Sequence, residues 1–274
     1  MLWTIAVLAM LAAAAQSLSF NSARIERRQL DDAQIDAVFD AAIARAVLGL
    51  GDARPDHRWR VDGVPQTFEF DGYVLRMAVQ DEFGRIDLNA ADGSLLRQLL
   101  RSAGVSETDA ETLTDRILSW RERDDGLSRL HGGTDDLYAS AGLAYRPRHG
   151  AFQSVDELRL VLGMNSALFA RIRAALTVYS HHPAIDTAVA PREALLAYYP
   201  DQPERVSELL KTRGGGSGDT LDAVPGTIAS TYGLAGRTFD ITATASVGQR
   251  RISREAVVML TSSPTRPYLL LLWR

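Results

Sequence analysis

The chain of 274 residues contains no cysteine, which excludes disulfide bridges and thiolate metal sites. A protein without cysteine suits a reducing cytosol and an oxidising periplasm equally, so this absence does not locate it. An excess of basic residues is also missing. The formal net charge is −4 and the isoelectric point is near 5.8, so there is no general attraction to nucleic acids. The hydrophobic content of 46% and the charged content of 23% are ordinary for a globular protein of one or two domains.

The sequence signatures of common enzyme classes are absent as well. There is no Gly-x-Ser-x-Gly motif, no phosphate-binding Walker loop and no zinc-protease helix. Of the five histidines only His181 and His182 are neighbours, and adjacent positions do not share a helix face. The run from Gly214 to Gly218 is not placed between a strand and a helix, so it indicates a flexible linker. We therefore expect no catalytic site.

A long uncharged stretch is present at the N-terminus, from Leu2 to Phe20. Its length and composition predict a membrane-spanning helix of minimal length. The alternatives are a secretory signal peptide, cleaved near Ala12–Ala15, and a buried core helix; no basic residue precedes the stretch, which disfavours a signal peptide. Arg24, Arg27 and Arg28 follow it and would place that flank in the cytoplasm by the positive-inside rule. We hypothesise that the true start lies upstream and that a short basic leader is missing.

Apolar residues continue beyond this stretch with helical periodicity and end at Gly49 and Gly51. They recur at steps of three and four: Ile35, Val38, Phe39, Ala42, Ile43, Ala46, Val47 and Leu50. This pattern predicts a long helix whose apolar face covers a sheet. Asp71-Gly72 predicts a hairpin turn between strands at Gln66–Phe70 and Tyr73–Asp81.

The middle of the chain has helical character, and strand character returns at the end. Predicted helix caps are Asn89 with Asp92, Ser106 with Asp109, and a capping box at Ser154. Further helices are expected over Ser166–Tyr179, Pro191–Tyr199 and Pro203–Arg213, and strands over Thr238–Val247, Arg250–Leu260 and, buried, Tyr268–Trp273. The order β, α, β predicts a helical module inserted into a sheet. Ile86–Ala91 is weakly repeated by Ile185–Ala190, and each copy precedes a leucine-rich helix.

Four segments carry a family resemblance in their order along the chain. They are Phe83–Asn89, Ile117–Arg121, Ser154–Leu158 before Leu162–Met164, and Pro267–Arg274. Together with the hydrophobic N-terminus, they resemble type II secretion system protein K, the large minor pseudopilin of the general secretion pathway. The resemblance covers nearly the whole chain, which makes it more specific than any single motif.

The resemblance implies an α+β fold in which a pilin-like long N-terminal helix packs on a small antiparallel sheet. A large all-helical domain, SAM-like or helix-hairpin-helix-like, is inserted between strands. The implied organisation is a transmembrane helix at 1–21, the helix continuation and first strands at 22–88, the inserted domain at 89–236, and the last strands at 237–274. The resemblance also implies a single inner-membrane span, a periplasmic body, and a place at the pseudopilus tip with minor pseudopilins I and J. There it would support the export of folded proteins. The family's basic leader ending in glycine is absent here, in agreement with a missing start.

The family is associated with calcium held by an acidic loop after the Trp-Arg motif. The matching residues here are Glu122, Asp124, Asp125, Asp135 and Asp136. Carboxylates and loop carbonyls supply the six to eight hard oxygens that calcium needs. Glu122 stands where the family more often has aspartate, and Thr134 where glutamate is expected, which reduces the expected affinity. The alternative is a solvated acidic loop. Trp120 and Tyr138 are interpreted as packing residues.

An alternative function is nucleic-acid binding by a membrane-anchored, DNA-uptake type of protein. Ile86–Ala91, a leucine-bearing helix, Gly104 and a second helix ending in Arg116–Arg123 are similar to a helix-hairpin-helix. Such hairpins bind phosphates through a Gly-hydrophobic-Gly turn that presents backbone N–H groups. The hairpin here has one glycine and the chain is acidic. These features favour a structural unit over a DNA-binding one.

Overall fold

The computed structural model describes residues 3, 4, 7, 10, 33–52, 54, 57–122, 132–214, 234–247 and 250–274. Residues 33–50 form a helix. The strands are β1 (Gln66–Phe70), β2 (Tyr73–Asp81), β3 (Ile86–Asp87), β4 (Leu176–Thr177), β5 (Thr238–Val247), β6 (Arg250–Leu260) and β7 (Tyr268–Trp273). The α-helices are α2 (Gly93–Ser102), α3 (Glu107–Arg121), α4 (Asp135–Ser140), α5 (Ser166–Ile172), α6 (Arg192–Tyr198) and α7 (Pro203–Gly214). The 3₁₀ helices are η2 (Glu82–Gly84), η3 (Val155–Leu160) and η4 (Arg173–Ala175). The predicted mixture of helices and an antiparallel sheet is confirmed.

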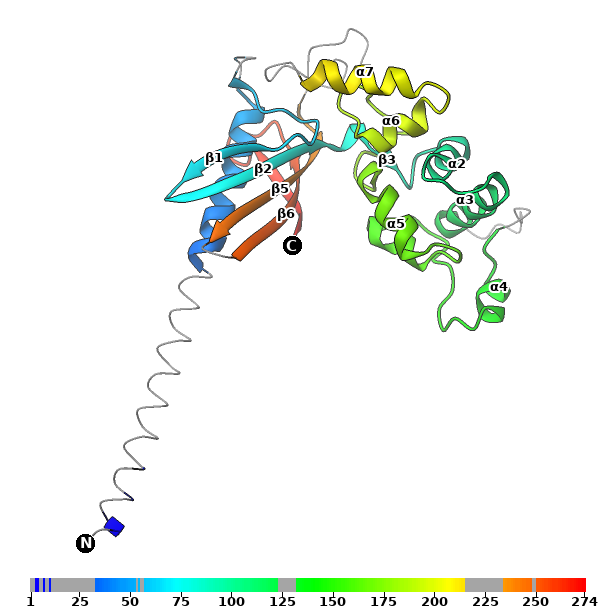
Figure 1. Cartoon of the computed structure of the whole chain (residues 1–274), viewed down its shortest axis with the longest axis horizontal. Helices are drawn as coiled ribbons and strands as arrows, with labels where there is room; N and C mark the ends of the chain where they lie inside the picture. Colours follow the sequence, from blue (N-terminus) through cyan, green and yellow to red (C-terminus); the bar gives the residue numbers. More distant parts are fainter. Residues whose placement is uncertain are drawn as a thin grey trace.

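The main sheet has five strands in the order β1-β2-β5-β6-β7, and all neighbours are antiparallel. The predicted β1–β2 hairpin is confirmed: Asp71 and Gly72 have φ of 50° and 77°, as a tight two-residue turn requires. Strands β2 and β5 are neighbours in the sheet although all the helices from α2 to α7 lie between them in the chain. These helices gather beside one end of the sheet (Figure 1).

The helix formed by residues 33–50 packs on one face of the sheet (Figure 1). All eight positions of its predicted apolar face are buried. They share a core with Leu75, Met77 and Val79 of β2 and Ile241 of β5. The helix runs through Gly49, where the sequence predicted its end. A Cβ at Gly49 would lie 1.7 Å from the Trp59 side chain, so the missing side chain makes room for that ring.

One of the predicted helix caps is confirmed: Ser106 accepts a hydrogen bond from the Asp109 N–H at 3.2 Å. Asp92, which was expected as an acid in the first turn after Asn89, is itself the cap of α2 and accepts the Leu95 N–H at 2.8 Å. Asn89 does not cap a helix: its amide bonds both the N–H and the carbonyl of Phe152, at 2.7 and 2.9 Å. Ser154 makes no side-chain cap hydrogen bond, so the capping-box prediction was wrong.

Two predicted elements differ because of tertiary pairing. The helix expected over 166–179 ends at Ile172, because the chain then turns through η4 into β4, which pairs in parallel with β3. Strand β7 was expected to be buried. It is the outer strand next to β6, so Leu270 and Leu271 are 51% and 44% exposed.

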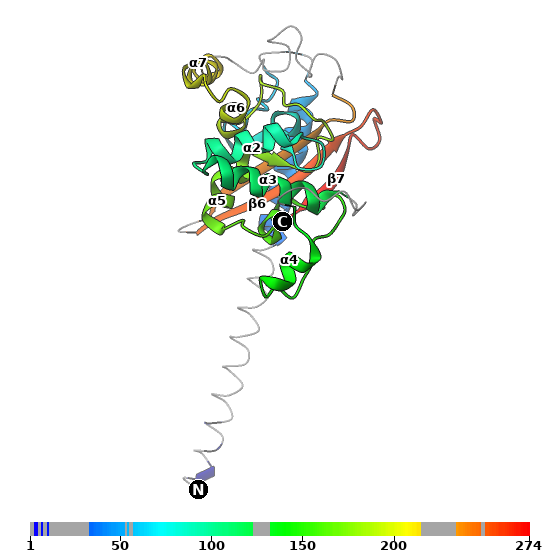
Figure 2. The same cartoon turned by 90° about the vertical axis from the view of Figure 1, so that its right-hand side faces the viewer.

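The helices between β2 and β5 enclose their own apolar core, and Figure 2 shows them in front of the sheet in that view. The predicted packing roles of Trp120 and Tyr138 are confirmed, because both side chains are buried. The Trp120 ring stacks on Phe152 with centroids 6.1 Å apart, and the Tyr138 hydroxyl accepts the Leu162 N–H at 2.9 Å.

Two predictions concern segments that lie mostly outside the described residues. The predicted membrane helix at 1–21 lies outside the described residues apart from residues 3, 4, 7 and 10, and residues 215–218 of the predicted linker also lie outside them. In the part of the chain that the structure describes, no helix combines the length and the apolar character needed to cross a membrane.

The helix–sheet contact generates a stability prediction. Phe39 is fully buried in this contact, so Phe39→Ala is expected to lower the free energy of unfolding by about 3–5 kcal/mol. Urea denaturation would measure the change. Leu48 lies on the same helix but is 75% exposed, and Leu48→Ala should stay within about 0.5 kcal/mol of the parent. Equal losses for both variants would contradict the packing described here.

Candidate functional site

The point where the chain leaves the sheet and the point where it returns are joined by a buried ion pair. Asp81 ends β2 and Arg237 precedes β5, and their side chains are 0% and 1% exposed. An Arg237 Nη2–H donates directly to the Asp81 carboxylate, which also accepts the Phe83 N–H at 2.9 Å. The Arg237 guanidinium lies 5.1 Å from the Phe83 ring centroid and 5.9 Å from that of Phe239. Its positive charge is therefore held by a carboxylate and two aromatic rings.

A second arginine joins the 3₁₀ helix that follows β2 to strand β5. Arg85 donates from Nη1 to Glu82 at 2.8 Å and lies 2.9 Å through Nη2 from Asp240. The Glu82 and Asp240 side chains are 1% and 9% exposed. One oxygen of each carboxylate and the Arg85 Nε have no hydrogen-bond partner. The hydrogen-bonding capacity of this buried polar cluster is therefore not fully used.

Backbone contacts complete the junction between the sheet and the helical part. The Gln80 side-chain amide donates to the Val189 carbonyl at 2.8 Å. Gly84 lies so close to this segment that a Cβ would come within 2.7 Å of the Val189 oxygen and 2.9 Å of the Ala190 Cα. The Asp186 N–H donates to the Phe83 carbonyl at 2.7 Å. Since only glycine fits at position 84, the segment 186–190 packs directly on the backbone that follows β2.

Burial changes the titration of the acidic groups in the junction. It raises the pKa of Asp81 to about 6, although the Arg237 charge opposes the shift. It raises the pKa of Glu82 to about 7, against the opposing charge of Arg85. The pKa of Asp240 is raised by burial in the same way. Desolvation of the charged forms is therefore stronger than attraction to the arginines.

The predicted calcium residues are only partly within the described chain. Asp124 and Asp125 lie outside it. Glu122 is the C-cap residue of α3, and Asp135 and Asp136 begin α4, where Thr134 caps the helix. The Asp135 carboxylate lies 3.2 Å from Arg146 and 3.3 Å from His149 Nε2. Calcium prefers carboxylate oxygens as ligands, but the Asp135 carboxylate already forms an ion pair with Arg146.

Neither region has the donor set of a complete metal site within the described residues. There, no three side chains among His, Cys, Asp and Glu are grouped so that they could hold an ion. The junction joins carboxylates to arginines and to backbone amides, and this arrangement fixes one part of the fold against another. We therefore regard the junction as a structural site that sets the position of the helical part.

Sequence reasoning did not identify the residues of this junction. Asp81, Glu82 and Arg85 lie in or beside the motif that carries the resemblance, but Arg237 and Asp240 are far from it in the chain. A signal existed in the strand pattern, because the alternating strand ends in two consecutive polar residues, Gln80 and Asp81. In the structure both are buried. An aspartate within the β-branched run of β5 is a second signal.

The junction predicts a pH dependence of stability that Glu82→Gln would reveal. The Glu82 carboxyl has an ordinary pKa of 4.5 and a folded-state pKa of about 7, so between these values the folded state binds more protons. Stability therefore falls as pH rises through this window. Since glutamine does not ionise, the variant should gain stability relative to the parent across the window, by on the order of 3 kcal/mol, and the gain should level off above it.

Urea unfolding at several pH values would measure this difference. Glu69→Gln, on exposed β1, is the matched control, and its difference from the parent should stay flat. A flat profile for Glu82→Gln as well would show that Arg85 keeps Glu82 ionised throughout.

Comparisons with known proteins agree with the resemblance seen in the sequence. A family described as "Type II secretion system (T2SS), protein K" matches residues 76–181, which include the end of β2, the first part of the junction and α2 to α5. Type II secretion system protein K of Pseudomonas aeruginosa is 24% identical over 221 residues, which cover 74% of this chain and 64% of that protein. The protein of the same name from Aeromonas hydrophila is 34% identical over 76 residues, or 28% of this chain and 23% of that protein.

A solved structure has a similar fold. It is the crystal structure of the GspK-GspI-GspJ complex from enterotoxigenic Escherichia coli, with a TM-score of 0.63 and 15% sequence identity. The alignment covers 90% of this chain and 98% of the matched one. The chain thus spans less than two thirds of the Pseudomonas relative but nearly the whole of the matched structure. Sequence, family model and fold are therefore each similar to those of type II secretion system protein K.

Proposed function

We propose that the chain is a minor pseudopilin at the tip of the pseudopilus of a type II secretion system. In this role it binds minor pseudopilins I and J and supports the export of folded proteins across the outer membrane. The observation that carries the proposal is the fold, which is similar over 98% of the matched chain to a protein solved in a GspK-GspI-GspJ complex. In this proposal the chain acts by binding other pseudopilins through its surface, and no residue is assigned a catalytic role.

We further propose a pilin-like organisation with an inserted domain. Residues 22–88 and 237–274 supply the long helix and the sheet, and residues 89–236 form the inserted helical domain. Two features support this division. The helix of residues 33–50 and the sheet share one apolar core, while α2, α3, α5 and α6 share another. The buried Asp81–Arg237 pair lies where the two parts meet.

The proposed location is the inner membrane, with one span at residues 1–21 and the bulk of the chain in the periplasm. The uncharged stretch from Leu2 to Phe20 supports the anchor. A continuous helix from the membrane to the sheet would then hold the folded part close to the bilayer. The absence of cysteine is compatible with a periplasmic location.

The geometry does not favour the nucleic-acid alternative. The turn between α2 and α3 has a single glycine, Gly104, with φ of 88°. The N-terminus of α3, where a phosphate would bind, carries Glu107 and Asp109 in its first turn. Their negative charges repel a phosphate, so this helix start lacks the attraction that helix-hairpin-helix motifs use.

Calcium remains a proposal for the acidic loop, with Glu122, Asp124, Asp125, Asp135 and Asp136 as its ligands. An ion bound to Asp135 would have to displace the side chains of Arg146 and His149, which now contact its carboxylate. The role of the ion would be to hold the segment between α3 and α4, the two helices that contribute the neighbouring Trp120 and Tyr138 rings.

Co-purification tests the proposed function. The chain, produced together with the I and J pseudopilins of the same organism, is expected to form a stoichiometric ternary complex that size-exclusion chromatography with light scattering would resolve. A single large surface substitution, Leu48→Arg on the exposed side of the 33–50 helix, provides a probe of that helix as a contact surface. Failure to form any complex, with and without calcium, would contradict the assignment.

The calcium proposal has its own test. Titration with calcium is expected to raise the melting temperature of the chain, because an ion that binds only the folded state stabilises it. The double variant Asp124→Asn/Asp125→Asn should lose this response. Glu69→Gln/Asp71→Asn removes the same charge at the distant β1–β2 hairpin and should keep it. A response that persists in the loop variant would exclude the acidic loop as the site.

A further inference from the structure

The face of the sheet opposite the helix of residues 33–50 carries two adjoining cavities. The first, of about 370 Å³, lies between β2, β5 and α7, and the second, of about 360 Å³, lies farther along β2 and β5. They share Ala78 and Thr242, which are cross-strand partners. Together these two cavities form a groove along the strands, which we call the sheet-face groove. Its floor is made of small side chains: Ala78, Thr242, Thr244 and Ser246.

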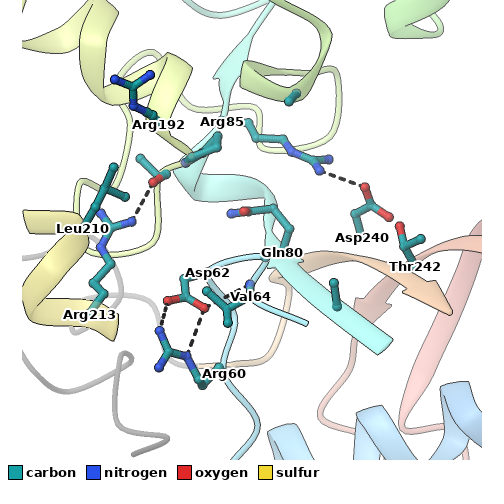
Figure 3. A pocket seen from close by; sticks show the side chains of 15 residues that line it. Arg60, Asp62, Val64, Gln80, Arg85, Arg192, Leu210, Arg213, Asp240 and Thr242 are labelled. Atoms are coloured by element: carbon teal, nitrogen blue, oxygen red, sulfur yellow. Dashed lines mark hydrogen bonds and ion pairs between the residues drawn. The ribbon is translucent and has the colours of Figure 1, made fainter. Parts of the chain in front are cut away.

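Positive charge dominates the lining of the sheet-face groove. Arginines that line it are Arg60, Arg76, Arg85, Arg192, Arg213 and Arg251, whereas the acidic residues are Asp62 and Asp240. Both aspartates are already paired, Asp62 with Arg60 at 2.5 Å and Asp240 with Arg85 at 2.9 Å (Figure 3). No carboxylate of the described residues forms an ion pair with the remaining four: Arg76, Arg192, Arg213 and Arg251.

One of these four arginines is held in place by the backbone. Arg213 of α7 donates to the carbonyls of Ala190, at 2.7 Å, and Thr187. It therefore stands at the edge of the groove on the side of α7, across from Gln80 and the sheet in Figure 3. Burial lowers the pKa of Arg213, although the charges of Asp62 and Asp186, neither of which forms an ion pair with it, oppose the shift. A carboxylate from outside would supply the missing charge.

We propose that the sheet-face groove binds an extended, acidic polypeptide segment of a partner protein. Carboxylates at one end of the segment would meet Arg192 and Arg213, and carboxylates at the other end would meet Arg76 and Arg251. The excess of arginine is local, because the chain as a whole has a formal charge of −4. Charge complementarity of this kind selects an acidic partner and speeds its approach. The proposal does not depend on the assignment as a pseudopilin.

The dimensions favour a polypeptide as the occupant. The groove extends along β2 from Gln80 to Val74, a length of roughly 20 Å at about 3.3 Å per residue. A segment of about seven extended residues has this length, and small floor side chains leave room for its own. A nucleic-acid backbone would carry phosphates along the whole groove, including past the Asp62 and Asp240 carboxylates, which disfavours it.

Fluorescence anisotropy with the full chain tests the proposal. The probe is a fluorescein-labelled seven-residue peptide with two glutamates at each end and serine and threonine between them, and lysine in place of glutamate gives the control peptide. We expect binding of the acidic peptide that weakens with added salt. The double variant Arg76→Gln/Arg192→Gln should weaken it by about tenfold, the effect of two partly exposed ion pairs.

Matched variants and competitors make the test decisive. Arg97→Gln/Arg171→Gln removes the same charge from a half-buried site on α2 and an exposed site on α5, both away from the groove, and should change affinity less than twofold. Ser246→Cys adds the only thiol of the chain, so a dye attached there should respond to the acidic peptide. Three results would each overturn the proposal: no binding at low salt, equal losses in both double variants, or tighter binding of oligothymidylate in the same groove.

Discussion

The buried contact between Asp81 and Arg237 holds the sheet and the helical part in one arrangement. The two residues are 156 positions apart in the sequence, and neither side chain reaches solvent. Removing either partner would leave a buried charge without compensation, which costs several kcal/mol. The pair is therefore stable only when the returning chain closes beside the end of β2. Since Asp81 is also the partner of Phe239 in the β2–β5 ladder, the same contact marks the last register position of the sheet before the helices begin.

The junction also explains why the two ends of the sheet differ in polarity. Along most of β2 the residues alternate, with Leu75, Met77 and Val79 facing the helix of residues 33–50. At the end near the helical part both faces are covered, so Gln80 and Asp81 are buried together. Polar groups placed there must find partners, and they do so in Arg85, Arg237 and the backbone of residues 186–190. Toward the β1–β2 turn only the face against the helix of residues 33–50 is covered, and Val74 and Arg76 on the other face are exposed.

The sequence was informative where structure depends on near neighbours. The apolar face of the 33–50 helix and the Asp71-Gly72 turn each follow from residues within a few positions, and both were predicted correctly. Strand β4 could not be foreseen, because its pairing with β3 replaces the helix that its residues prefer. The exposure of β7 depends on its place at the sheet edge, which no local pattern records. For the junction, the sequence located Asp81 and Arg85 near a motif, but it could not connect them with Arg237 and Asp240, because that connection exists only after the chain has returned.

The weak repeat in the sequence has a structural meaning at this same junction. Asp87 and Asp186 occupy equivalent positions in the two copies, and both are buried. The first accepts the Asn89 N–H at 2.7 Å and the second accepts the Ala188 N–H at 3.0 Å, so each begins a tight turn. The helices that follow, α2 and α6, pack against each other. Each copy therefore sets the direction of one helix from a buried aspartate close to the sheet. The Asp186 N–H also donates to the carbonyl of Phe83, which shortly precedes Asp87 in the chain. This hydrogen bond joins the turn before α6 to the segment before α2, so the orientation of the helical part is set where it meets the sheet.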